Sequence, residues 1–260
     1  MQYIRISDND FCFARYDSAA GASSFTFNTY RLQPQMSVTA NFREALSQVF
    51  FAAGSRVSTE ILVAGTSVLV PLSEFQEEDC ETIYGYCLPR EEKCRVFYDT
   101  VPSANVVLLF SLPDALCRTL EDTLGSLRYT SSAVAVSRRF AAKGKNAAGG
   151  RRVFVYVYGD TAEVSVYDEA RIVVMNSFRV SALSDVVYYT LSLAGQQSVD
   201  LSVAPVYVVA APEVRAAVAD ELRRYAADVC VVNPAAEFNR HPAATTEGVP
   251  YDLLCRLLAR

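Results

Sequence analysis

The sequence contains one pattern of elements twice. Residues 3–17 and 154–168 each consist of two short segments of alternating apolar and polar residues joined at a polar tip, and each ends in Tyr-Asp. This alternation is typical of half-buried strands, so each segment predicts a β-hairpin. In both copies a third strand and a helix follow, at 25–32 and 37–53 and at 171–180 and 181–194. The chain is therefore predicted to be an α/β protein of two similar halves, each with a mixed five-stranded sheet flanked by helices.

A second match continues the repeat at a different spacing. In the first half, a predicted strand at 106–110 leads into a helix and then a strand at 129–136. In the second half, a predicted strand at 206–209 leads into a helix and then a strand at 228–232. Each helix begins with Pro and an acidic residue, which is a favourable helix start. The longer spacing in the first half indicates an insertion of about 50 residues.

The predicted domains follow from these two matches. The first half covers 1–145 and carries an inserted subdomain at about 55–104, and the second half covers 146–260 with a C-terminal tail. In the insert we expect strands at 59–64, 68–70 and 95–98 and an acidic helix at 74–86. The Gly-rich, basic stretch 143–152 predicts a flexible linker. We expect the halves to face each other across a cleft near 149–152.

The composition restricts the class of protein. The chain has 260 residues, 51% of them hydrophobic, and 24 basic residues against 29 acidic ones. A net charge of −5 disfavours nucleic acid or an anionic membrane as the main partner, because both select a concentrated basic surface. The seven cysteines are too sparse, and odd in number, for a disulfide scaffold. The start of the chain lacks the apolar region of a signal peptide, and no apolar stretch is long enough to span a bilayer. We therefore expect a cytoplasmic protein.

Four segments carry a resemblance to a known family. They are Val-Pro-Leu at 70–72, Phe-Ser-Leu-Pro at 110–113, Glu-Phe-Asn-Arg-His-Pro at 237–242 and Val-Pro-Tyr-Asp-Leu at 249–253. With the repeated β-β-β-α-β-α-β order, they resemble an uncharacterised Bacteroidetes family of unknown function with a degenerate actin-like ATPase fold, which is a duplicated ribonuclease H-like fold. The resemblance covers nearly the whole chain, and it implies a fold without implying an activity.

The resemblance can be tested at the hairpin tips. Proteins of the actin-like superfamily hold phosphate there with an Asp-x-Gly-x-Thr/Ser pattern, in which Asp organises Mg²⁺ and Gly lets backbone N–H groups approach phosphate. In the second half Gly159 and Thr161 fit, but Val157 replaces the Asp. In the first half Ile6 replaces the Asp and Asp8 replaces the Gly, so a carboxylate stands where phosphate would bind.

The adenosine-binding element is also altered, because Ala210-Ala211-Pro212 replaces the expected Gly-Gly. The residues therefore predict no catalytic residue and no cofactor, and ordinary turn chemistry explains the polar tips. The alternative is a nucleotide-binding switch or weak ATPase that binds Mg-ATP. Its phosphate-binding residues would be Asp8, Asp10, Gly159, Asp160 and Thr161.

Other chemically interesting residues have simpler explanations. Cys80, Cys87 and Cys94 recur every seven residues, but this spacing differs from that of zinc sites and no fourth ligand is near, so no metal is predicted. The remaining cysteines, which are Cys12, Cys117, Cys230 and Cys255, lie in apolar patterns and predict core positions. The only histidine is His241, in a polar segment with Asn239 and Arg240. We expect these three residues to form a structural turn or a contact site for a partner.

The function predicted from the sequence is a non-catalytic interaction or scaffold module whose partner is another protein, possible also as a homodimer. The insert at 55–104 is the predicted binding surface, because the second half lacks it. A scaffold predicts an interdomain cleft filled by side chains, whereas a nucleotide switch predicts an open, polar one. A second alternative is an RNA-linked accessory role through the basic residues Arg138, Arg139, Lys143, Lys145, Arg151 and Arg152.

Overall fold

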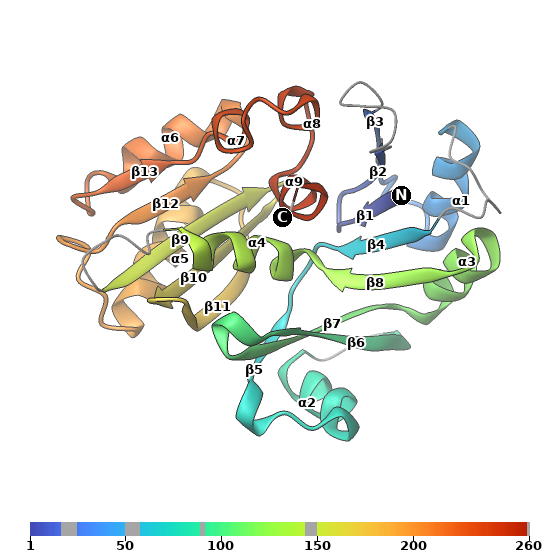
Figure 1. The fold of residues 1–260 in the computed structure, drawn as a ribbon, viewed down its shortest axis with the longest axis horizontal. Coiled ribbons are helices and arrows are strands. Elements are labelled where there is room, and N and C mark those ends of the chain that lie inside the picture. The colour runs from blue at the N-terminus through green and yellow to red at the C-terminus, as the bar shows by residue number, and fades with distance from the viewer. Residues whose placement is uncertain (17–24, 50–57, 89–91, 144–149, 259–260) are drawn as a thin grey trace.

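Two five-stranded sheets organise the chain (Figure 1). The structure is a computed structural model that describes residues 1–16, 25–49, 58–88, 92–143 and 150–258. The first sheet has the strand order β3-β2-β1-β4-β8, with β1 antiparallel to β2 and parallel to β4. Its strands are β1 (Gln2–Ile6), β2 (Asp10–Tyr16), β3 (Phe25–Arg31), β4 (Thr59–Val63) and β8 (Leu127–Ser131).

The second sheet has the equivalent order β11-β10-β9-β12-β13. Its strands are β9 (Arg151–Tyr158), β10 (Thr161–Asp168), β11 (Arg171–Arg179), β12 (Val206–Val209) and β13 (Val229–Val231). Both hairpins and both third strands therefore form as the alternation predicts. The mixed sheets flanked by helices confirm the predicted α/β fold class.

Helices cover both sheets and fill the space between them. On the outer face of the first sheet lie α1 (Val38–Gln48) and α3 (Asp114–Leu124), and on the outer face of the second lie α5 (Leu183–Gln196) and α6 (Pro212–Leu222). Between the sheets lie α4 (Ser132–Ala142) and α9 (Tyr251–Leu257), which pack together (Figure 1). Two short helices, α7 (Pro234–Glu237) and α8 (Pro242–Thr245), precede α9.

The insertion lies at a different place in the chain from the predicted one. The strand expected at 59–64 is β4, which pairs with β1 and belongs to the first five-stranded sheet. The strand expected at 106–110 is instead part of β7 (Val106–Pro113), which pairs with β5 (Val68–Pro71) and β6 (Cys94–Val101) in a separate three-stranded sheet. The additional segment is therefore 64–113. In sequence β7 is similar to β12, because both are apolar runs that precede a helix, but the two strands differ in the sheets to which they belong.

The acidic segment of the insert forms a helix later than expected. Short 3₁₀ turns occupy Leu72–Glu74, Glu77–Asp79 and Pro102–Ala104, and α2 spans Cys80–Cys87. Cys80 and Tyr84 of α2 pack against Val107 and Leu109 of β7. The alternate residues of β7 pack into the two larger cores, one between the five-stranded sheets and one between the first sheet and the helices α1 and α3. The insert therefore shares its central strand with the body of the protein.

One predicted strand is mostly helix. The strand expected at 129–136 ends at Ser131, whose side chain caps the first turn of α4 by accepting a hydrogen bond from the backbone N–H of Ala133. The run Ala133-Val134-Ala135-Val136 alternates like a strand, but it is buried on every side between the two sheets. A helix that is buried all round has no polar face, so its sequence lacks the 3.6-residue period. The boundary predicted at 145/146 lies outside the described residues.

Candidate functional site

A cavity of about 760 Å³ lies between the two halves. Its lining comes from the two hairpin tips, from the turn between β12 and α6, which lies beside the second tip because β12 pairs with β9, and from the chain between α8 and α9. The cleft expected near 149–152 is therefore misplaced, because Arg151 and Arg152 begin β9 and the cavity lies at the other end of that strand, beside Tyr158. Arg151 lines a smaller pocket of about 370 Å³ against the insert.

The first hairpin tip is held by its own side chains. The Ser7 hydroxyl donates to Asp10 Oδ1 over 2.7 Å, and it accepts hydrogen bonds from the backbone N–H groups of Asn9 and Asp10. Asp8 lies at the exposed end of the tip, and its pKa is raised, first by burial and then by the nearby carboxylate of Asp160. The tip thus carries negative charge toward the cavity.

The second hairpin tip contacts the first. Asn9 Nδ2 donates to Asp160 Oδ1 over 2.8 Å, and Arg179 Nε donates to Asp160 Oδ2 over 2.9 Å. Burial opposes ionisation of Asp160, but these hydrogen bonds lower its pKa. Gly159 has a φ of +53°, and a Cβ there would lie 2.6 Å from Asn9 Nδ2. Glycine is therefore required both by the turn and by the close approach of Asn9.

The structure brings most of the candidate phosphate-binding residues together. Asp8, Asp10, Gly159 and Thr161 line the cavity, whereas Asp160 is engaged by Asn9 and Arg179. The segment 210–212, the altered adenosine element, also lines the cavity. The expectation that a scaffold would fill this cleft with side chains is wrong, because the cavity is open.

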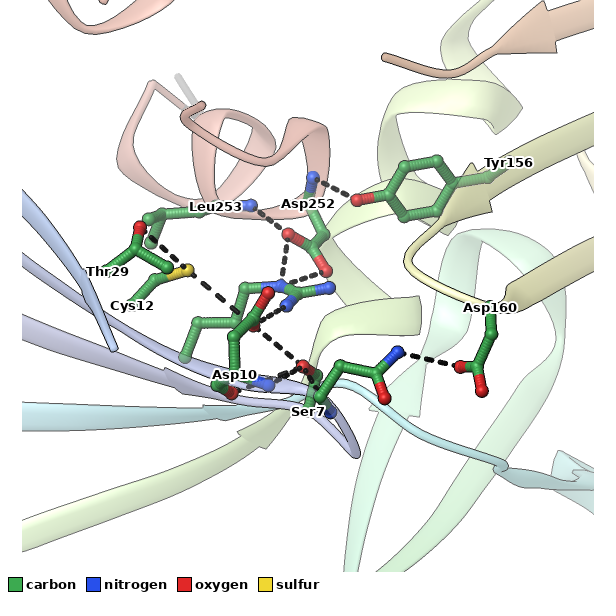
Figure 2. Close-up of polar contacts among 10 residues, drawn as sticks. Ser7, Asp10, Cys12, Thr29, Tyr156, Asp160, Asp252 and Leu253 are labelled. Atoms are coloured by element: carbon green, nitrogen blue, oxygen red, sulfur yellow. Dashed lines mark hydrogen bonds and ion pairs between the residues drawn. The ribbon is translucent and has the colours of Figure 1, made fainter. Parts of the chain in front are cut away.

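Beneath the cavity lies a buried ion-pair cluster that sequence reasoning missed (Figure 2). Arg5, only 1% exposed, donates from Nε to both carboxylate oxygens of Asp252 at 2.9 and 2.8 Å and from Nη1 to Asp10 at 3.1 Å. Burial opposes the charge of Arg5, but the adjacent Asp252 raises its pKa well above the usual value. The guanidinium also lies 5.1 Å from the ring centroid of Tyr158. Arg5 stands at a polar position of an alternating strand, so the local sequence predicts an exposed side chain at this position and not a buried ion pair.

The C-terminal helix α9 connects the two halves through this cluster. Asp252 contacts Arg5 of the first half, and its backbone N–H donates to the Tyr156 hydroxyl of the second half at 3.4 Å (Figure 2). Arg256 adds a bidentate ion pair with the buried Glu60 of β4, at 2.6 and 2.7 Å. The Tyr-Asp of the 249–253 segment therefore has a structural role between the sheets.

Another buried carboxylate lies on the face of the second sheet that carries Tyr156. Glu163 of β10 is 3% exposed and pairs in register with Tyr156. Burial, followed by the charge of Asp252, raises the pKa of Glu163 to about 8. Both Glu163 and Asp252 were outside the predicted site, because nothing in the local sequence indicates that residues so far apart share one interior.

The candidate contact residues of the tail form a turn. His241 caps α8, accepting the backbone N–H of Ala243 at Nδ1 over 3.2 Å, and its ring lies 5.6 Å from that of Tyr16. Asn239 and Arg240 are exposed and both have a φ of +52°, an uncommon conformation for a non-glycine residue. The neighbouring Glu237 holds the turn to the body.

Several basic residues between the halves form ion pairs or hydrogen bonds within the protein. Arg139 and Lys143 both form ion pairs with Glu237, and the Tyr251 hydroxyl donates to the same carboxylate. Arg151 donates to the backbone carbonyl of Gln197, and Arg152 is buried. Lys145 lies outside the described residues. Arg138 is exposed, and its Nη2 donates only to the backbone carbonyl of Thr100, at 3.5 Å.

Three of the four cysteines that were predicted to be core residues are buried. Cys12, Cys117 and Cys255 are core residues, but Cys230 is half-buried. In the insert Cys80 is buried, Cys94 half-buried and Cys87 exposed. Among the described residues no group of three or more His, Cys, Asp or Glu side chains is arranged to hold a metal ion. Within the same residues, no helix is long and apolar enough to cross a membrane.

Comparisons with known proteins agree on the fold. The family described as "Protein of unknown function (DUF3822)" matches residues 3–229. A solved protein of Bacteroides thetaiotaomicron, described as having an actin-like ATPase fold and unknown function, has a TM-score of 0.82 and 20% identity over 95% of each chain. A chain of the PilM-PilN type IV pilus biogenesis complex has a TM-score of 0.57 and 11% identity over 99% of this chain and 98% of that one. No curated protein matches.

Proposed function

Because the chain belongs to the DUF3822 family of proteins of unknown function and has an actin-like ATPase fold, we propose that it is a non-catalytic interaction module built on that fold. The observation that carries this proposal is the direct contact between the hairpin tips. Asn9 reaches across to Asp160 over 2.8 Å, in the position where ATPases of this superfamily place phosphate between the tips.

The charges around the tips support the same conclusion. Asp8 and Asp10 line this end of the cavity, and the nearest buried cation, Arg5, is already paired with Asp10 and Asp252. A phosphate chain entering here would meet these carboxylates, and the arginine beside the second tip, Arg179, is paired with Asp160.

Mg-ATP is the cofactor that the fold implies, and the residues present do not fit it. The carboxylate closest to the Mg²⁺-organising role is Asp10, but it already accepts hydrogen bonds from Ser7 and Arg5. At the second tip, Asp160 accepts from Asn9 and Arg179. Coordination of Mg²⁺ by these two residues would break contacts that hold both tips, so we derive no catalytic step through the group.

The partner in this proposal is another protein. A structural neighbour is part of a PilM-PilN complex, which supports protein partnering without identifying a partner. The insert 64–113 offers a surface with exposed aromatic rings, with Tyr86 87% exposed. A homodimer is a possible form of the partnership, and a cytoplasmic location and an origin by duplication belong to the same proposal.

A nucleotide-binding switch is the second candidate, and the open cavity favours it. At about 760 Å³ the cavity is within the size range of small-molecule sites, and Gly159 and Thr161 line it. This candidate requires the Asn9–Asp160 contact to open and Asp10 to leave Arg5.

Thermal unfolding with and without millimolar Mg-ATP, Mg-ADP and Mg-GTP decides between these candidates. A ligand at 100 times its Kd stabilises the native state by about 2.7 kcal/mol, which shifts the midpoint of a chain this long by several degrees. We expect no shift with any of the three nucleotides. A reproducible shift that Asp10→Asn alters would contradict the non-catalytic proposal in favour of the switch.

The protein-partner role is tested by affinity capture from a lysate of the native cells. Deletion of the insert is unsuitable, because Leu108 and Phe110 of β7 are buried in the larger cores. Tyr86→Ser changes only an exposed side chain of α2, and Tyr188→Ser on α5 is a matched control that is 66% exposed. We expect Tyr86→Ser alone to lose captured proteins, and equal capture by both variants would exclude this face of the insert.

A further inference from the structure

The wall of the interdomain cavity carries more negative than positive charge. Four carboxylates line it, from Asp8, Asp10, Glu213 and Glu247, against two arginines, Arg5 and Arg215. Both arginines are engaged, since Arg5 pairs with Asp10 and Asp252 and Arg215 donates to the backbone carbonyl of Val232.

Three of these carboxylates are available to a ligand. Asp8, Glu213 and Glu247 are exposed, and the described residues form no ion pair with any of them. The pKa of Asp8 is raised, first by burial and then by the negative charge of Asp160. A cationic group in the cavity would offset that negative charge.

The floor of the cavity offers the opposite kind of group. Arg5 is 1% exposed, and its Nη2 has no hydrogen-bond partner among the residues that the structure describes. Within the same residues, the buried hydroxyl of Tyr158, whose ring lies near the same guanidinium, also has no partner. Both groups are donors, and both residues line the cavity. Unpaired buried donors favour a ligand that brings an acceptor such as a carbonyl oxygen, while the surrounding carboxylates disfavour an anion.

Part of the cavity lining consists of small residues. Ala210, Ala211, Pro212, Ala235 and Ala244 leave backbone close to the cavity surface. Short side chains along this part of the lining leave room for the main chain of a bound segment.

We propose that the cavity binds an extended basic segment of a partner protein, with Lys or Arg side chains facing Asp8, Glu213 and Glu247 and a backbone carbonyl directed to the floor. This inference rests on the proposed interaction role and adds the chemistry of the partner. A peptide supplies both cations and carbonyl acceptors, whereas a nucleotide adds phosphate to a site that is already negative.

The test is the fluorescence anisotropy of a labelled hexalysine peptide at low salt, with hexaglutamate and spermine as competing probes. The cavity variant is Asp8→Asn/Glu247→Gln. Its matched control is Glu74→Gln/Glu78→Gln, which removes the same charge from two exposed positions in the insert. We expect hexalysine to bind the wild type, the cavity variant to lose about tenfold in affinity, and the control to change less than twofold.

Other outcomes would overturn the inference. Equal losses in both variants would indicate binding to net charge alone, and absence of hexalysine binding would exclude the site. Spermine binding as tight as hexalysine binding would identify a small polycation instead of a peptide. These results are independent of the nucleotide test: a failure here with no nucleotide shift leaves the interaction module in place, whereas a nucleotide shift refutes that module directly.

Discussion

Replacement of Glu163 by glutamine should make the protein more stable, and the gain should grow with pH. Glu163 is 3% exposed, and its pKa is about 8 in the folded protein against an ordinary value of 4.5. Between these values the unfolded chain loses the proton while the folded chain keeps it. The free energy of unfolding of the wild type therefore falls as pH rises through this window and levels off above about pH 8.

The size of the effect follows from the two pKa values. Linkage between 4.5 and about 8 gives a destabilisation of about 1 kcal/mol at pH 5 and about 4 kcal/mol at pH 8. Glu163→Gln cannot ionise, so its stability relative to wild type should increase by about 3 kcal/mol across this range. Any cost of packing the buried amide is the same at both pH values and cancels in the difference.

The assay is urea unfolding at about pH 5, 6, 7 and 8, with the free energy extrapolated to water at each pH. Glu213→Gln is the control, because it removes an exposed carboxylate, and surface substitutions usually change stability by less than about 0.5 kcal/mol. A difference between Glu163→Gln and wild type that stays constant with pH would refute the argument. It would mean that Glu163 is solvated or paired in the folded protein.

Two further substitutions test the contacts around the site. Asp252→Asn leaves Arg5 with only Asp10 as a charged partner, and we expect a loss of about 3–5 kcal/mol by urea unfolding, compared with little change for the exposed Asp220→Asn. Gly159→Ala should destabilise by about 1–2 kcal/mol, because φ is +53° and the new Cβ would meet Asn9, whereas Gly195→Ala in α5 should stabilise by up to about 1 kcal/mol because nothing lies within 4 Å. Equal effects of the two glycine variants on the unfolding midpoint would contradict the assigned turn.

The sequence predicts local elements well and long-range partners poorly. The hairpin 154–168 could be read from alternation alone, because each strand has one face on a core and a short polar tip. The start of α4 could not, since residues 132–137 are all buried and give no helical period. The sheet assignment of β4 and β7 failed for a related reason: both are short apolar runs, and only their pairing partners distinguish them.

The same limit applies to the site. The candidate positions Asp8, Asp10, Gly159 and Thr161 could be located because hairpin tips in equivalent halves are expected to face each other. Their chemistry depends on Arg5 and Asp252, which are 247 residues apart in the chain. In the sequence, each member of this pair is only a charged residue in a strand or a helix, and nothing nearby identifies its partner.

The position of this buried ion pair supports a role for α9 in fixing the geometry of the cavity. A buried ion pair is weak evidence for stability, because apolar residues of similar size are often as stable, but it restricts which surfaces can meet. The buried Arg5 needs a carboxylate partner, and Asp252 on α9 provides it. The backbone N–H of Asp252 also donates to the Tyr156 hydroxyl of the other half. The two sheets, α9 and the first hairpin tip are thereby set in one arrangement. Asp8 and Glu247 both line the cavity whose shape this arrangement fixes, and a fixed shape lowers the cost of ordering a site when a ligand binds.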